Sequence, residues 1–200
     1  MGMENEADIL ERAQAGDSEA FGLLYDHYLD AIYRFIYYKV FSREVAEDLV
    51  SDTFFKALRQ LQSYNSSRGR FNSWLYQIAR NTVIDHYRTK KENVPIDDIF
   101  DLGHDERTPD QLDAVAGLAK VEEYLKALPA RQREIITLRI WEGKSFDEIA
   151  SILGGTEGSV KMAFSRSIRQ LREVCGESAP LILLLAATLP FSVYSYYTHI

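Results

Sequence analysis

Residues 151–164, SILGGTEGSVKMAF, decide the fold of the C-terminal part of the chain. Their glycines fit two different structures, a phosphate-binding loop or a corner between two helices. A Walker-type phosphate loop requires a lysine directly after its last glycine, whereas Ser159 follows Gly158 here. The residues just before the glycines carry apolar side chains three and four positions apart, which is the spacing of a helical face. The stretch therefore predicts a corner between two helices.

The corner has the side-chain pattern of a helix-turn-helix. Ile149 and Leu153 are expected to face inward, and Ala150 is small enough for two helices to approach closely. Gly154 can take the left-handed conformation of the turn, and Val160 is expected to pack back from the second helix. An ordinary helical hairpin with a basic surface is the alternative.

The second helix of the corner is expected to present polar and basic side chains to solvent. Ser145 and Glu148 form a capping box before the first helix, and Thr156 or Ser159 is placed to cap the second. The inward stripe of the second helix is apolar, so its opposite face is free to meet a DNA major groove. The outward residues are Lys161, Met162, Ser165, Arg166, Arg169 and Arg172.

Another helix with a polar outer row is expected at residues 74–88. This row mixes amides and guanidinium groups between Tyr76 and Tyr87, which suits unstacked bases and a phosphate backbone. A polar loop just before the helix, SYNSSRGRF, has a composition suited to an extruded base. The outward residues are Gln77, Arg80, Asn81, Ile84 and Arg88, and the loop contributes Tyr64, Asn65, Arg68 and Arg70.

The net charge of the 200 residues is -7, which taken alone argues against nucleic-acid binding. The charge is unevenly distributed, however. Residues 1–30 and 92–119 each hold eight acidic residues against one arginine, so the rest of the chain is positive. Most of the positive excess lies in residues 67–91, where six basic residues face one acid. A basic cluster beside aromatic side chains is typical of a nucleic-acid interface, and a solvated basic face is the alternative.

Helical periodicity occurs on both sides of an acidic segment, residues 92–119, that contains Pro95, Gly103 and Pro109. The hydrophobic content of 46% is enough for a buried core, and no stretch alternates as a strand does. The sequence predicts an all-α fold. Two helical domains at residues 15–91 and 120–175 are joined by an acidic linker, and an apolar C-terminal tail follows at residues 178–200.

The sequence lacks the residue patterns that are typical of an active site. Cys175 is the single cysteine, so it forms no internal disulfide, and a reducing compartment, the cytoplasm, is expected. We expect no catalytic residue, metal or cofactor, because no spacing typical of metal ligands occurs and the histidines are scattered. They are His27, His86, His104 and His199.

Three blocks of the chain resemble bacterial sigma factors of the extracytoplasmic-function (ECF) group, within the sigma-70 family, over about residues 15–175. Residues 46–58, AEDLVSDTFFKAL, resemble region 2.2, which docks on the clamp helices of the polymerase β′ subunit. Residues 71–88, FNSWLYQIARNTVIDHYR, resemble regions 2.3 and 2.4, which separate the strands at the minus-10 element. Residues 128–173 resemble region 4, whose second helix reads the minus-35 element.

The resemblance implies a sigma factor that binds core RNA polymerase, including the flap of the β subunit, and directs promoter-specific transcription initiation. It implies polymerase contacts at Glu47, Asp48 and Asp52. It implies minus-10 contacts at Asn65, Arg68, Arg70, Gln77, Arg80, Asn81 and Arg88. It implies minus-35 contacts at Lys161, Arg166 and Arg169, and Met162 and Ser165 on the same outward face are expected to join them. Ala163 stands where the family often carries arginine. The preferred minus-35 sequence is therefore not predicted by the resemblance.

Several alternatives stay open. The acidic linker resembles a nucleic-acid mimic in the RNA path of the polymerase, or it is only a solvated tether. The tail at residues 178–200 is long enough for a membrane tether, or it folds onto the protein's own surface and inhibits it. The resemblance also suggests an anti-sigma factor as a partner. The rival class is a two-domain transcription regulator, which would not need residues 46–58 and 74–88.

Overall fold

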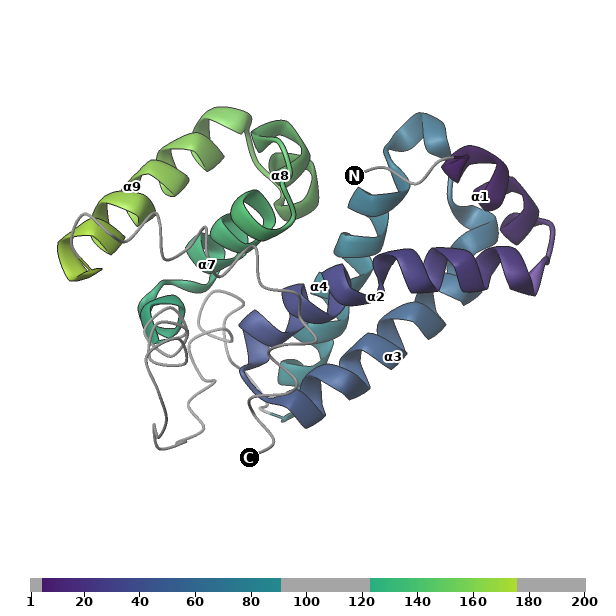
Figure 1. The fold of residues 1–200 in the computed structure, drawn as a ribbon, viewed down its shortest axis with the longest axis horizontal. Helices are drawn as coiled ribbons and strands as arrows, with labels where there is room; N and C mark the ends of the chain where they lie inside the picture. The colour runs from purple at the N-terminus through teal and green to yellow at the C-terminus, as the bar shows by residue number, and fades with distance from the viewer. Residues whose placement is uncertain (1–4, 91–122, 176–200) are drawn as a thin grey trace. The chain divides into compact units, whose positions relative to one another are not determined.

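The structure, a computed structural model, describes residues 5–90 and 123–175, and these residues are helices and short connections without a strand (Figure 1). The chain divides into two compact units. The first, here the N-terminal unit, contains Met1–Tyr37 and Ser42–Glu92, and the second, the C-terminal unit, contains Tyr38–Phe41 and Asn93–Ile200. The predicted all-α fold is confirmed. The predicted linker and apolar tail lie outside the described residues.

The described part of the N-terminal unit contains four α-helices and two short 3-10 turns. They are α1 (Glu6–Gln14), α2 (Ser18–Val40), α3 (Arg43–Gln60), η1 (Leu61–Ser63), η2 (Ser66–Arg68) and α4 (Phe71–Lys90). The last three residues of α2 are assigned to the C-terminal unit. The core is aromatic and aliphatic, and α3 and α4 pack closely along each other. Phe35 of α2 meets Tyr76 of α4 edge to face, with ring centroids 5.1 Å apart. Burial of these large side chains supplies most of the stability of such a small bundle.

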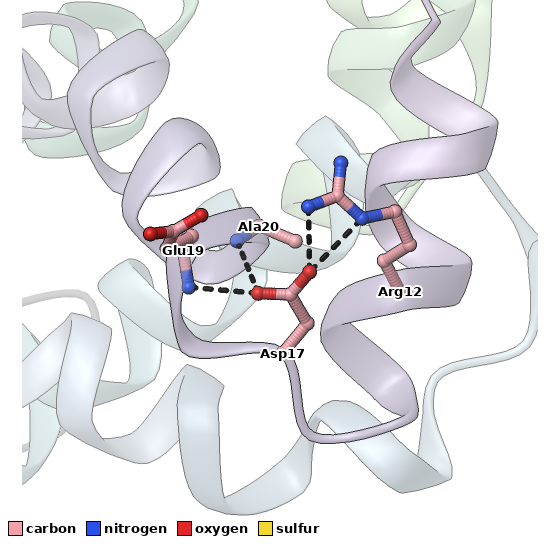
Figure 2. Close-up of polar contacts among 4 residues, drawn as sticks. All are labelled: Arg12, Asp17, Glu19 and Ala20. Carbon is pink, nitrogen blue, oxygen red and sulfur yellow. Dashed lines mark hydrogen bonds and ion pairs between the residues drawn. The ribbon is translucent and has the colours of Figure 1, made fainter.

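Asp17 links the first two helices and caps the start of α2. Its Oδ1 accepts hydrogen bonds from the backbone N–H groups of Glu19 (2.9 Å) and Ala20 (3.2 Å) (Figure 2). Its Oδ2 accepts from the Nε and Nη2 atoms of Arg12 on α1, at 2.9 and 2.6 Å. The Arg12 hydrogen bond is the main cause that lowers the pKa of Asp17, and the backbone N–H donors add to it.

We expect Asp17→Asn to lower the Tm at neutral pH, because asparagine keeps the helix cap but cannot pair with the Arg12 guanidinium. The folded pKa of Asp17 lies below the unfolded value of about 3.9, so the lost stabilisation is present above that pH and disappears as the pH falls. The Tm gap between wild type and variant should therefore close in acid. The control is Asp26→Asn, an exposed carboxylate on α2, which should show no such gap.

Besides Tyr38–Phe41, the described part of the C-terminal unit starts with a helical stretch at 123–127. Pro129 stands at the N-cap of α7 (Ala130–Ile136), which continues as a π-helical turn, η3 (Thr137–Trp141). After a turn at Gly143, with φ 61°, come α8 (Phe146–Leu153) and α9 (Glu157–Cys175). The predicted capping box is confirmed: Ser145 Oγ accepts from Glu148 N (3.2 Å), and Glu148 Oε2 accepts from Ser145 N (2.8 Å).

Arg133 is an arginine inside the C-terminal unit, with only 4% of its surface exposed. Its Nε donates to the carbonyl oxygen of Leu125 (2.7 Å). Its Nη2 donates to the carbonyl oxygens of Lys126 (3.2 Å) and Leu128 (3.0 Å). The last carbonyls of a helix have no partner within the helix, so this guanidinium supplies the donors at the end of the 123–127 stretch.

Candidate nucleic-acid interface

The corner at the end of α8 has the geometry that the sequence predicted. Ile149, Leu153 and Val160 are buried, and Ala150 lies between them with little exposure. Gly154 has φ 71° and ψ 132°, a conformation with positive φ that glycine adopts at little cost. The helix-turn-helix prediction is therefore confirmed at each of these positions.

The start of α9 is fixed by a reciprocal pair of hydrogen bonds. Thr156 Oγ1 accepts from Ser159 N (3.2 Å), while Ser159 Oγ accepts from Thr156 N (3.3 Å). Arg131 of α7 holds the turn from the other side, because its Nη1 donates to the carbonyl of Leu153 (3.1 Å) and its Nη2 donates to the carbonyl of Gly154. We did not predict Arg131, since a partner 22 residues away leaves no local pattern.

The outer face of α9 is open to solvent at each residue predicted for duplex contact. Met162 is 61% exposed, an unusual exposure for a large apolar side chain. Lys161 Nζ lies 2.7 Å from Glu157 Oε1, so an acid one turn earlier already pairs with it. Lys161 Nζ also lies 5.8 Å from the ring centroid of Phe146 on α8, and the guanidinium carbon of Arg139 lies 4.7 Å from the same centroid. The exposed predicted residues are Lys161, Met162, Ser165, Arg166 and Arg169.

The outer row of α4 is narrower than the sequence suggested. Gln77, Asn81 and Arg88 are exposed, and Arg80 is half-buried. Ile84, however, is only 6% exposed, so its predicted outward placement is wrong. Tyr76, at 1% exposed, cannot flank the row either, because its ring packs against Phe35 in the core. The helix is buried over a wider arc than its apolar periodicity indicates.

The loop before α4 is built on hydrogen bonds. Asn65 caps η2, since its Oδ1 accepts from Ser67 N (2.9 Å) and Ser67 Oγ (2.7 Å). The Tyr64 hydroxyl donates to the carbonyl of Gly69 (3.1 Å). Asn65 and the two predicted arginines, Arg68 and Arg70, are all exposed on this loop. The loop thus presents an amide and two guanidinium groups together.

Aromatic rings line the inner side of this loop. The ring centroid of Tyr64 lies 5.4 Å from Phe71 and 5.3 Å from Trp74. Partial burial, with a smaller contribution from the Glu6 carboxylate, raises the pKa of the Tyr64 phenol. Half-buried rings beside exposed polar groups suit the stacking of an unpaired base. Trp74 was not predicted here, although its place at the first turn of the helix after the loop was a usable signal.

The third predicted surface, on α3, carries acid and apolar side chains. Glu47, Asp48 and Asp52 are exposed, and Glu47 Oε1 is paired with Arg43 Nε at 2.7 Å. Phe55 and Leu58 continue the row at helical spacing, 59% and 49% exposed. These two apolar residues were missed, although Phe55 follows Asp52 by three residues and Leu58 follows Phe55 by three, a spacing that makes each pair neighbours on the helix surface.

Comparison with known proteins identifies the family. The sequence model described as Sigma-70 region 2 matches residues 24–92, and that described as Sigma-70, region 4 matches residues 118–171. The ECF RNA polymerase sigma factor BldN of Streptomyces coelicolor is 36% identical over 176 residues, which is 86% of this chain and 66% of BldN. The RNA polymerase sigma-H factor of Pseudomonas aeruginosa is 30% identical over 177 residues, 82% of this chain and 90% of that protein.

One solved structure, described as CnrH in complex with the cytosolic domain of CnrY, shares the fold. Its TM-score is 0.66 at 23% identity, over 86% of this chain and 97% of that one. The chain spans about two thirds of the length of BldN. These matches show that the chain belongs to the ECF group of the sigma-70 family of sigma factors. It is a sigma factor, a protein of promoter recognition and transcription initiation, and the rival class of two-domain regulator is set aside.

Proposed function

We propose that the chain binds core RNA polymerase and opens promoters, with the work divided between its two units. Region 2, at residues 15–91, docks on the polymerase and melts the minus-10 element. Region 4, at residues 120–175, reads the minus-35 duplex. The observation that carries the proposal is the confirmed helix-turn-helix, with cationic and small side chains exposed along the outer face of α9.

For the minus-35 element, α9 offers two kinds of contact. Arg166 and Arg169 are suited to phosphates or to the acceptors of guanine, and Met162 is suited to a thymine methyl group. The pairing of Lys161 with Glu157 implies an exchange, because the ammonium group must leave the carboxylate to reach a phosphate. Part of the Lys161 contribution to affinity is then offset by the lost pair.

For the minus-10 element, two polar groups of residues are available: the loop at residues 64–70 and the outer row of α4, the helix that follows it. Asn65 would hydrogen-bond an extruded base, with Tyr64 and Trp74 as its stacking wall. Arg68, Arg70 and Arg88 would follow the backbone of the unpaired strand. Gln77, Arg80 and Asn81 complete the predicted set.

For the polymerase, the exposed face of α3 supplies both charge and apolar area. Asp48 and Asp52 have no ion pair within the described part of the chain, so they can meet basic residues of the clamp helices. Phe55 and Leu58 would be covered in the complex. Charged residues steer such an encounter, while buried aromatic residues carry most of its affinity. The predicted contact of region 4 with the β flap completes the polymerase contacts.

We also propose an inhibitory protein partner of the anti-sigma type. CnrH, which shares the fold, was solved with the cytosolic domain of CnrY. The proposed site of action is the cytoplasm, where core polymerase acts. No helix in residues 5–90 or 123–175 combines the length and apolar character needed to cross a bilayer. The predicted membrane tether at residues 178–200 lies outside the described residues.

Run-off transcription with purified core polymerase tests the proposal. The wild-type chain should direct initiation from specific start sites on genomic templates, and the core enzyme alone should not. Binding to promoter DNA without any initiation would overturn the proposal, because that is the behaviour of an ordinary DNA-binding regulator.

We expect Arg166→Ala and Arg169→Ala each to weaken binding to a minus-35 duplex by roughly tenfold, the typical effect of losing a base or phosphate contact. If the lost contact is a phosphate, the slope of log K against log salt should also fall by about 0.9. Fluorescence anisotropy over a salt series measures both quantities. Arg59→Ala removes an exposed arginine of the N-terminal unit and should leave both unchanged. Equal affinities for all three variants would contradict the placement of the duplex on α9.

A further inference from the structure

Gln14, the last residue of α1, holds a segment about fifty residues further along the chain. Its Nε2 lies 2.9 Å from the carbonyl oxygen of Leu61 and 2.9 Å from that of Tyr64. An amide nitrogen carries two hydrogens, so both of its donors are used. These two carbonyls stand at the beginning and at the end of η1, and the pair of bonds therefore fixes the whole turn against α1.

The second of these carbonyls belongs to Tyr64, the first residue of the minus-10 loop at residues 64–70. Tyr64 is followed by Asn65, the residue proposed to receive the extruded base. The far end of the loop is fixed separately, by the Tyr64 hydroxyl on the carbonyl of Gly69. Gln14 thus holds the point where the chain enters the loop, while its own side chain is only partly exposed and both of its donors are used by backbone carbonyls.

Helix α1, which carries Gln14, is itself held firmly in place. Ile9, Leu10 and Ala13 of α1 are buried. Arg12 is joined through two hydrogen bonds to Asp17 at the start of α2 (Figure 2). A second link further along α2 is the hydroxyl of Tyr28, which donates to the Glu6 carboxylate. A side chain on a helix held in this way can set the position of a loop, because the helix does not move with the loop.

We propose that Gln14 is a positioning residue for promoter recognition. It fixes the minus-10 loop so that Asn65 and the rings of Tyr64 and Trp74 discriminate among bases. The inference rests on the proposed minus-10 role of this loop. The two hydrogen bonds from Gln14 restrict the loop before DNA binds, so the loop loses less conformational entropy on binding. Gln14 acts on base selection through the loop and touches no nucleotide.

The test measures base discrimination by the holoenzyme. The probe is a labelled single-stranded oligonucleotide carrying the non-template minus-10 sequence of a promoter on which the wild-type holoenzyme initiates, and its partner has that sequence scrambled. The ratio of the two affinities is the readout. A loss of folded protein lowers both affinities alike and leaves the ratio unchanged, so the ratio separates positioning from stability.

Gln14→Met has a similar length without donors, and Gln14→Glu keeps the shape but places acceptors against the two carbonyls. Each should lower the ratio about tenfold, the order expected for two neutral hydrogen bonds. Gln14→Lys should recover part of it, because an ammonium group can donate to both carbonyls. Gln62→Met, an exposed glutamine of η1, is the matched control and should keep the wild-type ratio.

The possible outcomes distinguish the minus-10 role of the loop from the positioning role of Gln14. If the wild-type holoenzyme does not prefer the matched oligonucleotide, the proposed minus-10 function of the loop fails, and the role of Gln14 fails with it. If the wild type discriminates and the Gln14→Met and Gln14→Glu variants discriminate equally well, the proposed function stands and the positioning role is overturned.

Discussion

Replacing Arg133 by methionine is expected to destabilise the C-terminal unit by about 3 kcal/mol, since hydrogen bonds from a charged donor contribute roughly 1.5–3 kcal/mol each. Methionine fills most of the volume but leaves the carbonyls of Leu125, Lys126 and Leu128 without their donor. Removing a buried charge also removes its desolvation cost, which offsets part of the loss. The loss of hydrogen bonds is expected to exceed the relief of desolvation, because two of these bonds are buried.

Native-state hydrogen exchange measures this effect unit by unit. Protection should fall most in α7, α8 and α9, because the three hydrogen bonds of Arg133 go to carbonyls of residues 125–128 and its guanidinium carbon lies 5.0 Å from the ring centroid of Phe41, which also belongs to the C-terminal unit. Binding to the minus-35 duplex should fall with the folded fraction. For the protection measurement alone, Arg172→Met, at an exposed arginine of α9, is the control for the change of residue type. Equal protection in the Arg133→Met and Arg172→Met proteins would show that the buried guanidinium is not needed.

The helix-turn-helix could be predicted from the sequence because its determinants are local. Gly154 has a conformation that few other residues adopt, and Ser145 caps a helix only three residues from its partner Glu148. Ile149 and Val160 lie on faces fixed by helical periodicity. Each signal lies within about ten residues of the next, so the pattern could be interpreted without knowledge of the rest of the fold.

The residues that sequence reasoning missed act over long distances or against the usual preferences of their type. Gln14 meets carbonyls 47 and 50 residues away, and no spacing rule connects them. Arg133 is charged, and charged residues are almost never expected inside a unit. The wrong placement of Tyr76 and Ile84 has a related cause, because periodicity marks the centre of a buried face but not its width.

The exposed apolar residues of α3 provide the last and sharpest test of the proposed polymerase surface. Phe55 is 59% exposed, and the guanidinium carbon of Arg59 lies 5.7 Å from its ring centroid. Truncating it should leave the Tm of the isolated protein nearly unchanged, because the side chain is mostly exposed and buries little apolar area in the N-terminal unit. If a partner covers the ring, its burial is worth about 2 kcal/mol, and aromatic residues at the centre of an interface commonly exceed this value.

We therefore expect Phe55→Ala to raise the Kd for core polymerase by roughly 30-fold, because each 1.4 kcal/mol corresponds to about a factor of ten. The loss should depend little on ionic strength, whereas Asp52→Asn should weaken binding mainly at low salt, where charges act over longer distances. Leu23→Ala on α2 removes another exposed apolar side chain, 47% exposed, and is the matched control. If Phe55→Ala and Leu23→Ala bind core polymerase equally well, the apolar end of α3 is a solvent-exposed surface and the polymerase contact must lie elsewhere on the chain.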